Sequence, residues 1–160
     1  MSDRFAKVER YAKLRDGWLI DTNIVSATIG NKPLDPGIVH FFERIPDERL
    51  WLSVLTMGEL RKGIELLSVD AKDLLESKLG ELQSAWKDRI LPVGLEVADK
   101  WGELTAWCQR RGSPVPPIDG LIAATACVHN LILVSHDKFF ARMEERLVVY
   151  DPLSGEGQAR

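Results

Sequence analysis

A short apolar run that ends on a carboxylate narrows the possible folds of this chain. The run Trp-Leu-Ile at residues 18–20 is followed by Asp21 and by a turn-forming Thr-Asn pair. A continuous apolar run of this length is typical of a parallel strand that is covered on both faces. Asp21 would then lie at the carboxyl end of that strand, which is the edge of an open α/β sheet where ligands bind.

Apolar runs and amphipathic helical patterns alternate along the rest of the chain. Further strands are predicted over residues 50–54, 89–93, 131–134 and 147–150. Helices are predicted over residues 24–29, 36–45, 56–67, 70–86, 95–111, 118–127 and 138–145. This alternation favours an α/β fold with a parallel central sheet and helices on both faces. The run at residues 131–134 is the most apolar and is expected to be the central strand.

Composition limits the classes of function. The chain has 160 residues, which is enough for one domain with a real core. Its net charge of −3 argues against a general nucleic-acid coating protein but allows a nuclease, whose carboxylates offset its basic contacts. No apolar run approaches the roughly 20 residues of a membrane span, and the N-terminus has no apolar signal core. We therefore expect a cytoplasmic protein with no membrane contact, in which Cys108 and Cys127 are reduced and buried.

The predicted domain does not fill the whole chain. We place it at residues 17–152, after an N-terminal extension at 1–16 and before a flexible tail at 153–160. In the extension, Phe5, Val8 and Ala12 fall at helical spacing among basic residues. A solvated extension, a contact to RNA and a contact to a partner protein all remain open for this segment.

Four carboxylates are predicted to meet at the carboxyl edge of the sheet. Asp21 and Asp137 directly follow strands, and Glu59 and Asp119 lie in the first turns of helices. The placement of Asp119 at this edge is the least direct of the four, because its helix must begin at the edge after a proline-rich loop has led the chain back to it. Each of the last three also has a structural explanation: Glu59 as the partner of Thr56 in a capping box, Asp119 as a charge favoured by the helix dipole, and Asp137 as an N-cap.

The chemistry of this edge suits a divalent cation. Four neighbouring carboxylates repel one another, and without a cation some would take up protons. An oxygen-rich site that is poor in His and Cys favours Mg²⁺ or Mn²⁺, which can activate a water and stabilise the leaving oxygen of a phosphodiester. Arg61, Lys62 and Lys138 are candidates for phosphate contacts, with an exposed solvated charge as the alternative.

Four segments together resemble the PIN-domain ribonucleases, and among them the VapC-like toxins of bacterial toxin–antitoxin pairs. The segments are residues 19–23, 52–64, 118–126 and 133–137, and the likeness runs in matching order over residues 18–152. The resemblance implies a PIN-like fold and an acidic metal site made of Asp21, Glu59, Asp119 and Asp137. It also implies that Asn23 and Ser135 support this site by hydrogen bonds. His136 stands where the family often has Arg, which leaves a substrate contact at this position open.

The resemblance implies a function as well. The chain would be a metal-dependent endoribonuclease that acts on RNA and is neutralised by a small antitoxin that binds operator DNA. Asp21 and Asp119 would hold the main metal, while Glu59 and Asp137 complete the site and orient water. We expect a homodimer for two reasons. The 70–86 helix and the stripe around Trp101 offer apolar surface, and members of the family that the chain resembles generally dimerise.

Two other classes of function are alternatives. One is a non-catalytic interaction module with the same fold, against which the presence of all four acids argues. The other is a phosphotransfer enzyme with Asp21 as its nucleophile. Haloacid dehalogenase-like phosphatases, however, have a second Asp where this chain has Asn23.

Overall fold

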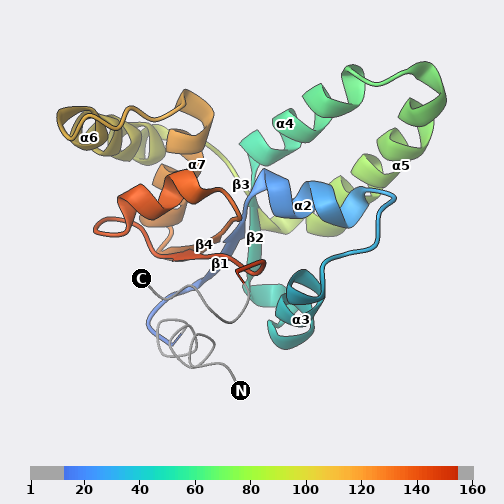
Figure 1. The fold of residues 1–160 in the computed structure, drawn as a ribbon, viewed down its shortest axis with the longest axis horizontal. Helices are drawn as coiled ribbons and strands as arrows, with labels where there is room; N and C mark the ends of the chain where they lie inside the picture. Colours follow the sequence, from blue (N-terminus) through green and yellow to red (C-terminus); the bar gives the residue numbers. More distant parts are fainter. Residues whose placement is uncertain (1–12, 155–160) are drawn as a thin grey trace.

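A five-stranded, all-parallel sheet forms the centre of the computed structural model, which describes residues 13–154 (Figure 1). The strands follow the order β3-β2-β1-β4-β5 across the sheet. Their bounds are β1 (Gly17–Ile20), β2 (Leu50–Ser53), β3 (Ile90–Leu91), β4 (Leu131–Val134) and β5 (Val149–Tyr150). The predicted α/β fold with a parallel sheet is confirmed. Residues 1–12, with the helical spacing of the extension, and residues 155–160 of the predicted tail lie outside the described residues.

The helices connect these strands. They are α2 (Thr22–Ile29), α3 (Pro36–Arg44), α4 (Val54–Glu65), α5 (Val69–Trp86), α6 (Leu95–Arg110) and α7 (Pro117–Val128). Short 3₁₀ helices are η1 (Asp47–Arg49), η2 (Lys87–Arg89) and η3 (Lys138–Met143). Asp35 caps α3, because its Oδ1 accepts a hydrogen bond of 2.7 Å from the amide of Gly37.

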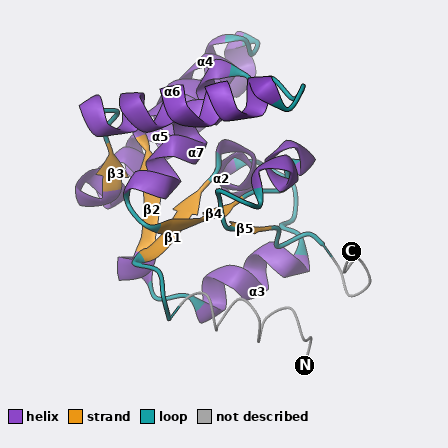
Figure 2. Cartoon of the chain, turned by 90° about the vertical axis from the view of Figure 1, so that its left-hand side faces the viewer, coloured by secondary structure: helices purple, strands orange, loops and turns teal. Residues whose placement is uncertain are grey.

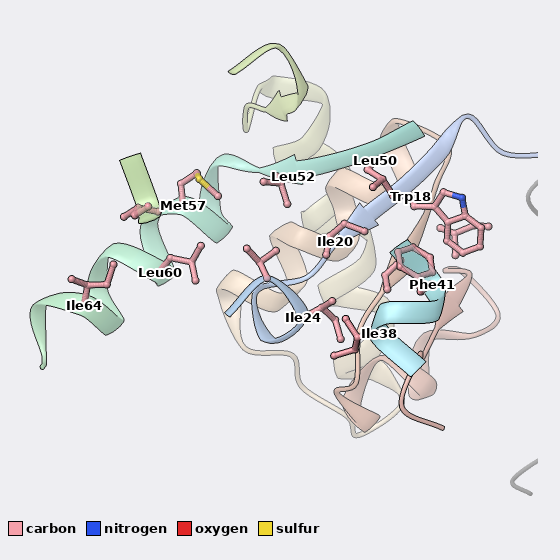
Figure 3. Packing of buried hydrophobic residues seen from close by; sticks show 14 residues of the cluster. Trp18, Ile20, Ile24, Ile38, Phe41, Leu50, Leu52, Met57, Leu60 and Ile64 are labelled. Carbon is pink, nitrogen blue, oxygen red and sulfur yellow. The ribbon is translucent and has the colours of Figure 1, made fainter. Parts of the chain in front are cut away.

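Alternating side chains divide the core into two layers. Trp18 and Ile20 of β1 pack with α2, α3, α4 and α5, whereas Leu19 packs with α6, α7 and η3 on the other face. Figure 2 shows α6 and α7 on the opposite side of the sheet from α3. Figure 3 shows the first layer, in which Ile24 and Phe41 approach the strand residues Trp18 and Ile20. Because both faces of β1 are covered, all four of its residues are buried.

The strand order places a topological switch between β1 and β4. From β1 the chain builds outward through β2 to β3, and then returns to add β4 on the other side of β1. At such a switch the connections leave in opposite directions, which opens a crevice at the carboxyl ends of the two strands. The prediction that residues 131–134 form the central strand is wrong in detail. β4 is an interior strand, but β1 occupies the middle of the sheet.

Several element boundaries differ from the sequence prediction. β2 ends at Ser53, and α4 begins at Val54 because the Ser53 hydroxyl caps it, accepting a hydrogen bond of 3.2 Å from the amide of Leu55. The helix therefore starts two residues before the predicted position at Thr56. Residues 138–143 form a 3₁₀ helix, and the last strand is limited to residues 149–150.

α4 and α5 form a helical hairpin, which projects from the sheet (Figure 1). Arg61 of α4 lies 3.1 Å from Glu76 of α5, and Lys72 of α5 lies 2.6 Å from Glu65 of α4. Apolar residues at and beside its tip are exposed, namely Leu66, Leu67, Val69 and Leu74. In the described part of the chain, no helix combines the length and apolar character needed to cross a membrane. Both cysteines are free; Cys108 is buried as expected, and Cys127 is only partly buried.

Candidate active site

The register between β1 and β4 brings Asp21 and Ser135 together. Ile20 pairs with Val134, and the amide of Asp21 donates to the carbonyl of Val134 at 2.9 Å, so the next residues of both strands are neighbours. The Ser135 hydroxyl donates to Oδ2 of Asp21 at 2.7 Å, and the amide of Thr22 donates to Oδ1 at 2.8 Å. Both oxygens of this carboxylate are fixed in direction.

Asp21 is the most buried of the predicted acids, with 5% of its surface exposed. The pKa of Asp21 is raised to about 6. Burial is the largest cause, the hydrogen bonds from Ser135 and Thr22 act in the opposite direction, and the charges of Asp119 and Glu59 add to the rise. Asp119 and Glu59 therefore lie close enough to Asp21 to disfavour its ionised form. A buried carboxylate with like charges beside it is the environment that a cation would relieve.

Glu59 projects from α4 toward the start of α2. The Thr22 hydroxyl donates a short hydrogen bond to Oε2 of Glu59, and the hydroxyl oxygens of Thr22 and Thr56 lie 3.3 Å apart. Because Thr22 gives its single hydroxyl proton to Glu59, the fully buried Thr56 hydroxyl is the donor of the second bond. The capping-box explanation for Glu59 is wrong, because Ser53 is the N-cap and Thr56 lies inside the helix.

Asp119 lies in the first turn of α7, where the sequence prediction was least direct. Burial raises the pKa of Asp119, and the charges of Glu59 and Asp137 raise it further. Since α7 precedes β4 and runs back along it, the start of α7 must lie at the carboxyl edge. Gly120 permits this position, since a Cβ atom there would lie 3.0 Å from the indole of Trp101 on α6.

Asp137 has a structural role as well as a place at this edge. Its Oδ1 accepts a hydrogen bond of 2.8 Å from the amide of Phe139 and so caps η3, as the N-cap alternative predicts. Its own amide donates to the Ser135 hydroxyl at 3.0 Å. Its charge acts on Asp119, so Asp137 is both a cap and a neighbour of the other acids.

Asn23 and Ser135, for which the resemblance implies a supporting role, connect the two strand ends. The Asn23 amide nitrogen donates to the Ser135 hydroxyl at 3.2 Å, and its oxygen accepts from the amide of His136 at 3.4 Å. Thr22 and Thr56 are the polar residues that sequence reasoning missed. The signal in the sequence was their position near the acids, since Thr22 directly follows Asp21 and Thr56 lies three residues before Glu59.

The donor set fits a hard divalent cation in its chemistry. All four acids offer carboxylate oxygens, which Mg²⁺ and Mn²⁺ prefer. Among residues 13–154, however, no three His, Cys, Asp or Glu side chains form a ready-made metal cluster. The four carboxylates lie near one another at this edge, but they do not surround one common position.

Of the basic candidates, Arg61 serves another contact, and one cavity lies away from the acidic edge. Arg61 pairs with Glu65 and Glu76 within the hairpin, so its charge is used there, while Lys62 and Lys138 are exposed. A cavity of about 200 Å³ borders the amino-terminal ends of β1 and β4 and is lined by Asp16, Trp51, Leu91, His129 and Leu131. It lies away from the acidic edge.

A doubly covered parallel sheet with neighbouring acids at its switch point defines the class of this protein. The family model of the PIN domain matches residues 18–146. The chain therefore belongs to the PIN-domain family.

Named relatives and solved structures agree with this assignment. The chain is 32% identical over 127 residues to Toxin FitB of Neisseria gonorrhoeae, covering 77% of this chain and 91% of that protein. It is 29% identical over 121 residues to VapC ribonuclease Y4jK of Sinorhizobium fredii, covering 74% and 86%. Its fold matches the crystal structure of FitAcB from Neisseria gonorrhoeae with a TM-score of 0.76 at 30% identity, over 86% of this chain and 99% of that one. It also matches VapBC-5 of Mycobacterium tuberculosis, described as a member of the VapBC family of toxin–antitoxin systems, with a TM-score of 0.62 at 25% identity, over 85% and 97%.

Proposed function

We propose that this protein is an endoribonuclease and serves as the toxin of a toxin–antitoxin pair. The relatives named as a ribonuclease and as a toxin support this proposal, since each matches about three quarters of the chain. The observation that carries it is the set of acids at the switch point, where the charges of Glu59 and Asp119 act on the buried Asp21. The cleaved bond would be an RNA phosphodiester.

Each acid would have a distinct part in the reaction. Asp21 and Asp119 would hold a Mg²⁺ or Mn²⁺ ion, and Glu59 and Asp137 would complete the site and orient the attacking water. When bound, the ion would supply an activated water and stabilise the leaving oxygen. Ser135 keeps Asp21 in its orientation, and Thr22 does the same for Glu59. Because these side chains are already oriented, less free energy is needed to rearrange the site during each reaction.

The proposed partners follow from the relatives and from the surface. An antitoxin is expected because solved structures with this fold come from toxin–antitoxin systems. We further propose that the antitoxin binds operator DNA and that two copies of this chain associate. The exposed Leu66, Val69 and Leu74 on the α4–α5 hairpin offer apolar surface for association. The stripe at Trp101 contributes less than predicted, because Trp101 packs against Gly120 within the molecule.

Metal removal tests the activity directly. Purified protein is incubated with a bulk RNA in Mg²⁺, in Mn²⁺ and in EDTA, with Asp21→Asn as the control for a contaminating nuclease. We expect cleavage with either ion, none in EDTA, and recovery when the ion is restored, because an all-oxygen site needs the cation's charge. Full cleavage in EDTA would contradict the metal mechanism, and no cleavage by wild type in either ion would favour the non-catalytic module.

The phosphotransfer alternative gains no support from the site. It needs a second acid at position 23, where Asn23 instead bridges Ser135 and the backbone of His136. The side chain at this position joins β1 to β4.

A further inference from the structure

Lys62 of α4 is an exposed cation near the acidic edge that the proposed reaction does not use. It lies three residues after Glu59, so the two side chains share one face of the helix, with their Cβ atoms about 5–6 Å apart. α4 begins at the carboxyl end of β2, and helical side chains lean toward the N-terminus of their helix. The side chain of Lys62 therefore leans toward the turn that carries Glu59, away from the tip of the hairpin.

Arg61, the residue before Lys62, has its charge compensated within the hairpin. Its guanidinium lies 3.5 Å from Glu65 and 3.1 Å from Glu76 of α5. Consecutive residues are turned by about 100° around a helix axis, so Lys62 does not face these two glutamates. Within residues 13–154, Lys62 takes part in no ion pair. Its charge is available to a ligand.

Cations are scarce on the helices that begin at the acidic edge. Neither α2 nor α7 contains a Lys or an Arg. An RNA strand is a polyanion, and the carboxylates at this edge repel its phosphates wherever a metal ion does not offset their charge. A cation on the same helix face as Glu59 would offset this repulsion beside the metal site. Lys138, which follows Asp137, is the other exposed lysine near the edge.

We propose that Lys62 binds a backbone phosphate of the RNA next to the cleaved phosphodiester and so holds the strand across the acidic edge. A contact to phosphate positions the strand and carries no sequence information. Lys62 would be a substrate-binding residue with no part in breaking the bond. This inference rests on the proposed function, since it takes RNA as the substrate of the same site.

Salt-dependent binding tests the proposal without relying on cleavage. The Asp21→Asn variant, which should not cleave, is titrated with a single-stranded RNA at several KCl concentrations, without divalent ions. Adding Lys62→Gln should weaken binding about two- to fivefold at low salt, the range expected for one exposed ion pair. It should also reduce the slope of log affinity against log salt concentration by about 0.7, the value for one phosphate contact on a single strand. Lys62→Arg keeps the charge and should preserve both quantities.

Arg61→Gln is the matched control, because it removes a neighbouring positive charge that is paired on another side of the same helix. It should change neither the affinity nor the slope. Lys138→Gln tests the other exposed lysine near the edge and should have less effect than Lys62→Gln. Thermal midpoints of all variants are measured to show that each one folds.

Cleavage kinetics separate a binding role from a general structural one. In the wild-type background with Mg²⁺, Lys62→Gln should raise KM for RNA about two- to fivefold and leave kcat within about twofold, because the contact is made equally before and during the reaction. A fall in kcat at constant KM would overturn the assignment of Lys62 to binding.

The remaining outcomes distinguish this proposal from the proposed function. Unchanged affinity and slope in Lys62→Gln would show that Lys62 is only a solvated charge and would overturn the proposal. An equal loss in Arg61→Gln, or a larger one in Lys138→Gln, would overturn it as well. Metal-dependent cleavage by wild type, measured separately, would uphold the nuclease function in each of these cases. RNA binding with the expected Lys62 dependence but no cleavage in either metal would keep the contact and overturn the nuclease function.

Discussion

Asp21 combines two opposing influences that the sequence alone could not reveal. Hydrogen bonds from Ser135 and Thr22 favour its charged form, yet burial outweighs them and raises its pKa to about 6. Its usual value of 3.8 applies in the unfolded chain. Between these two values the folded protein binds more protons than the unfolded one, so folding stability falls as pH rises through this window.

Asp21→Asn should separate activity from stability. Asn keeps the size and an acceptor for Ser135 but lacks the charge that a cation needs, so RNA cleavage should fall by several orders of magnitude. Without metal, the variant should be more stable than wild type above about pH 6, and the difference should shrink as pH falls toward 4. Thermal midpoints across this range, with and without Mg²⁺, provide the measurement. Wild-type cleavage and a wild-type midpoint shift with Mg²⁺ would remove Asp21 from the site.

Thr22 and Thr56 give a second test at this scale. Thr22→Val removes the donor to Glu59 and should lower cleavage about tenfold or more, as expected for a hydrogen bond to a charged group. Thr56→Val removes only the next hydroxyl and should have a smaller effect, while Thr22→Ser and Thr56→Ser should stay near wild type. Unchanged initial rates in Thr22→Val would show that Glu59 needs no such support.

At the scale of elements, the sequence predicted which strands and helices exist better than where they begin. The capping-box reading of Glu59 depended on a helix start at Thr56. Ser53, Thr56 and their neighbours allow several starts, and only the docking of α4 against the sheet selects Ser53 as the cap. For Asp119, the position followed from the order of elements, but its distance from Asp21 depends on how closely α7 approaches α6. Periodicity does not report such packing.

Gly120→Ala should show how much the site depends on that approach. The added methyl would press on the indole of Trp101, and overpacking of this kind costs about 1–3 kcal/mol. We expect a lower thermal midpoint and slower cleavage, because the first turn of α7 carries Asp119. Gly102→Ala on α6 is the matched control, since nothing lies within 4 Å of its added methyl. That variant should be stabilised slightly, by about 0.5–1 kcal/mol at most. Equal midpoints for the two variants would contradict the packing argument.

For the whole molecule, the sequence anticipated the parallel sheet, the two covered faces and the common acidic edge. It could not supply the strand order, because alternating patterns fix neither neighbours nor register. The exposed tip of the α4–α5 hairpin at Leu66 and Leu67 was also not visible in the sequence, whereas the apolar side of the 70–86 helix, which carries the exposed Leu74, was expected to serve association.

The hairpin surface leads to a prediction about assembly. We expect a homodimer at micromolar concentration in light scattering, since Leu74 of α5 is 52% exposed beside other apolar residues. Leu74→Glu should weaken the dimer without lowering the midpoint of the folded subunit. Leu95→Glu places the same charge at an exposed leucine of α6 and should leave assembly intact. A monomeric wild-type protein would contradict this prediction.

The switch between β1 and β4 also has a consequence for protein synthesis. Asp21 and Ser135 are 114 residues apart in the sequence. The hydrogen bond between them therefore cannot form until β4 has left the ribosome. A contact between residues so far apart in the sequence forms late in folding, after the chain between β1 and β4 is available. A growing chain that already contains Asp21 and Glu59 still lacks Asp119 and Asp137. The proposed cleavage activity would therefore arise only when translation of this chain is nearly complete.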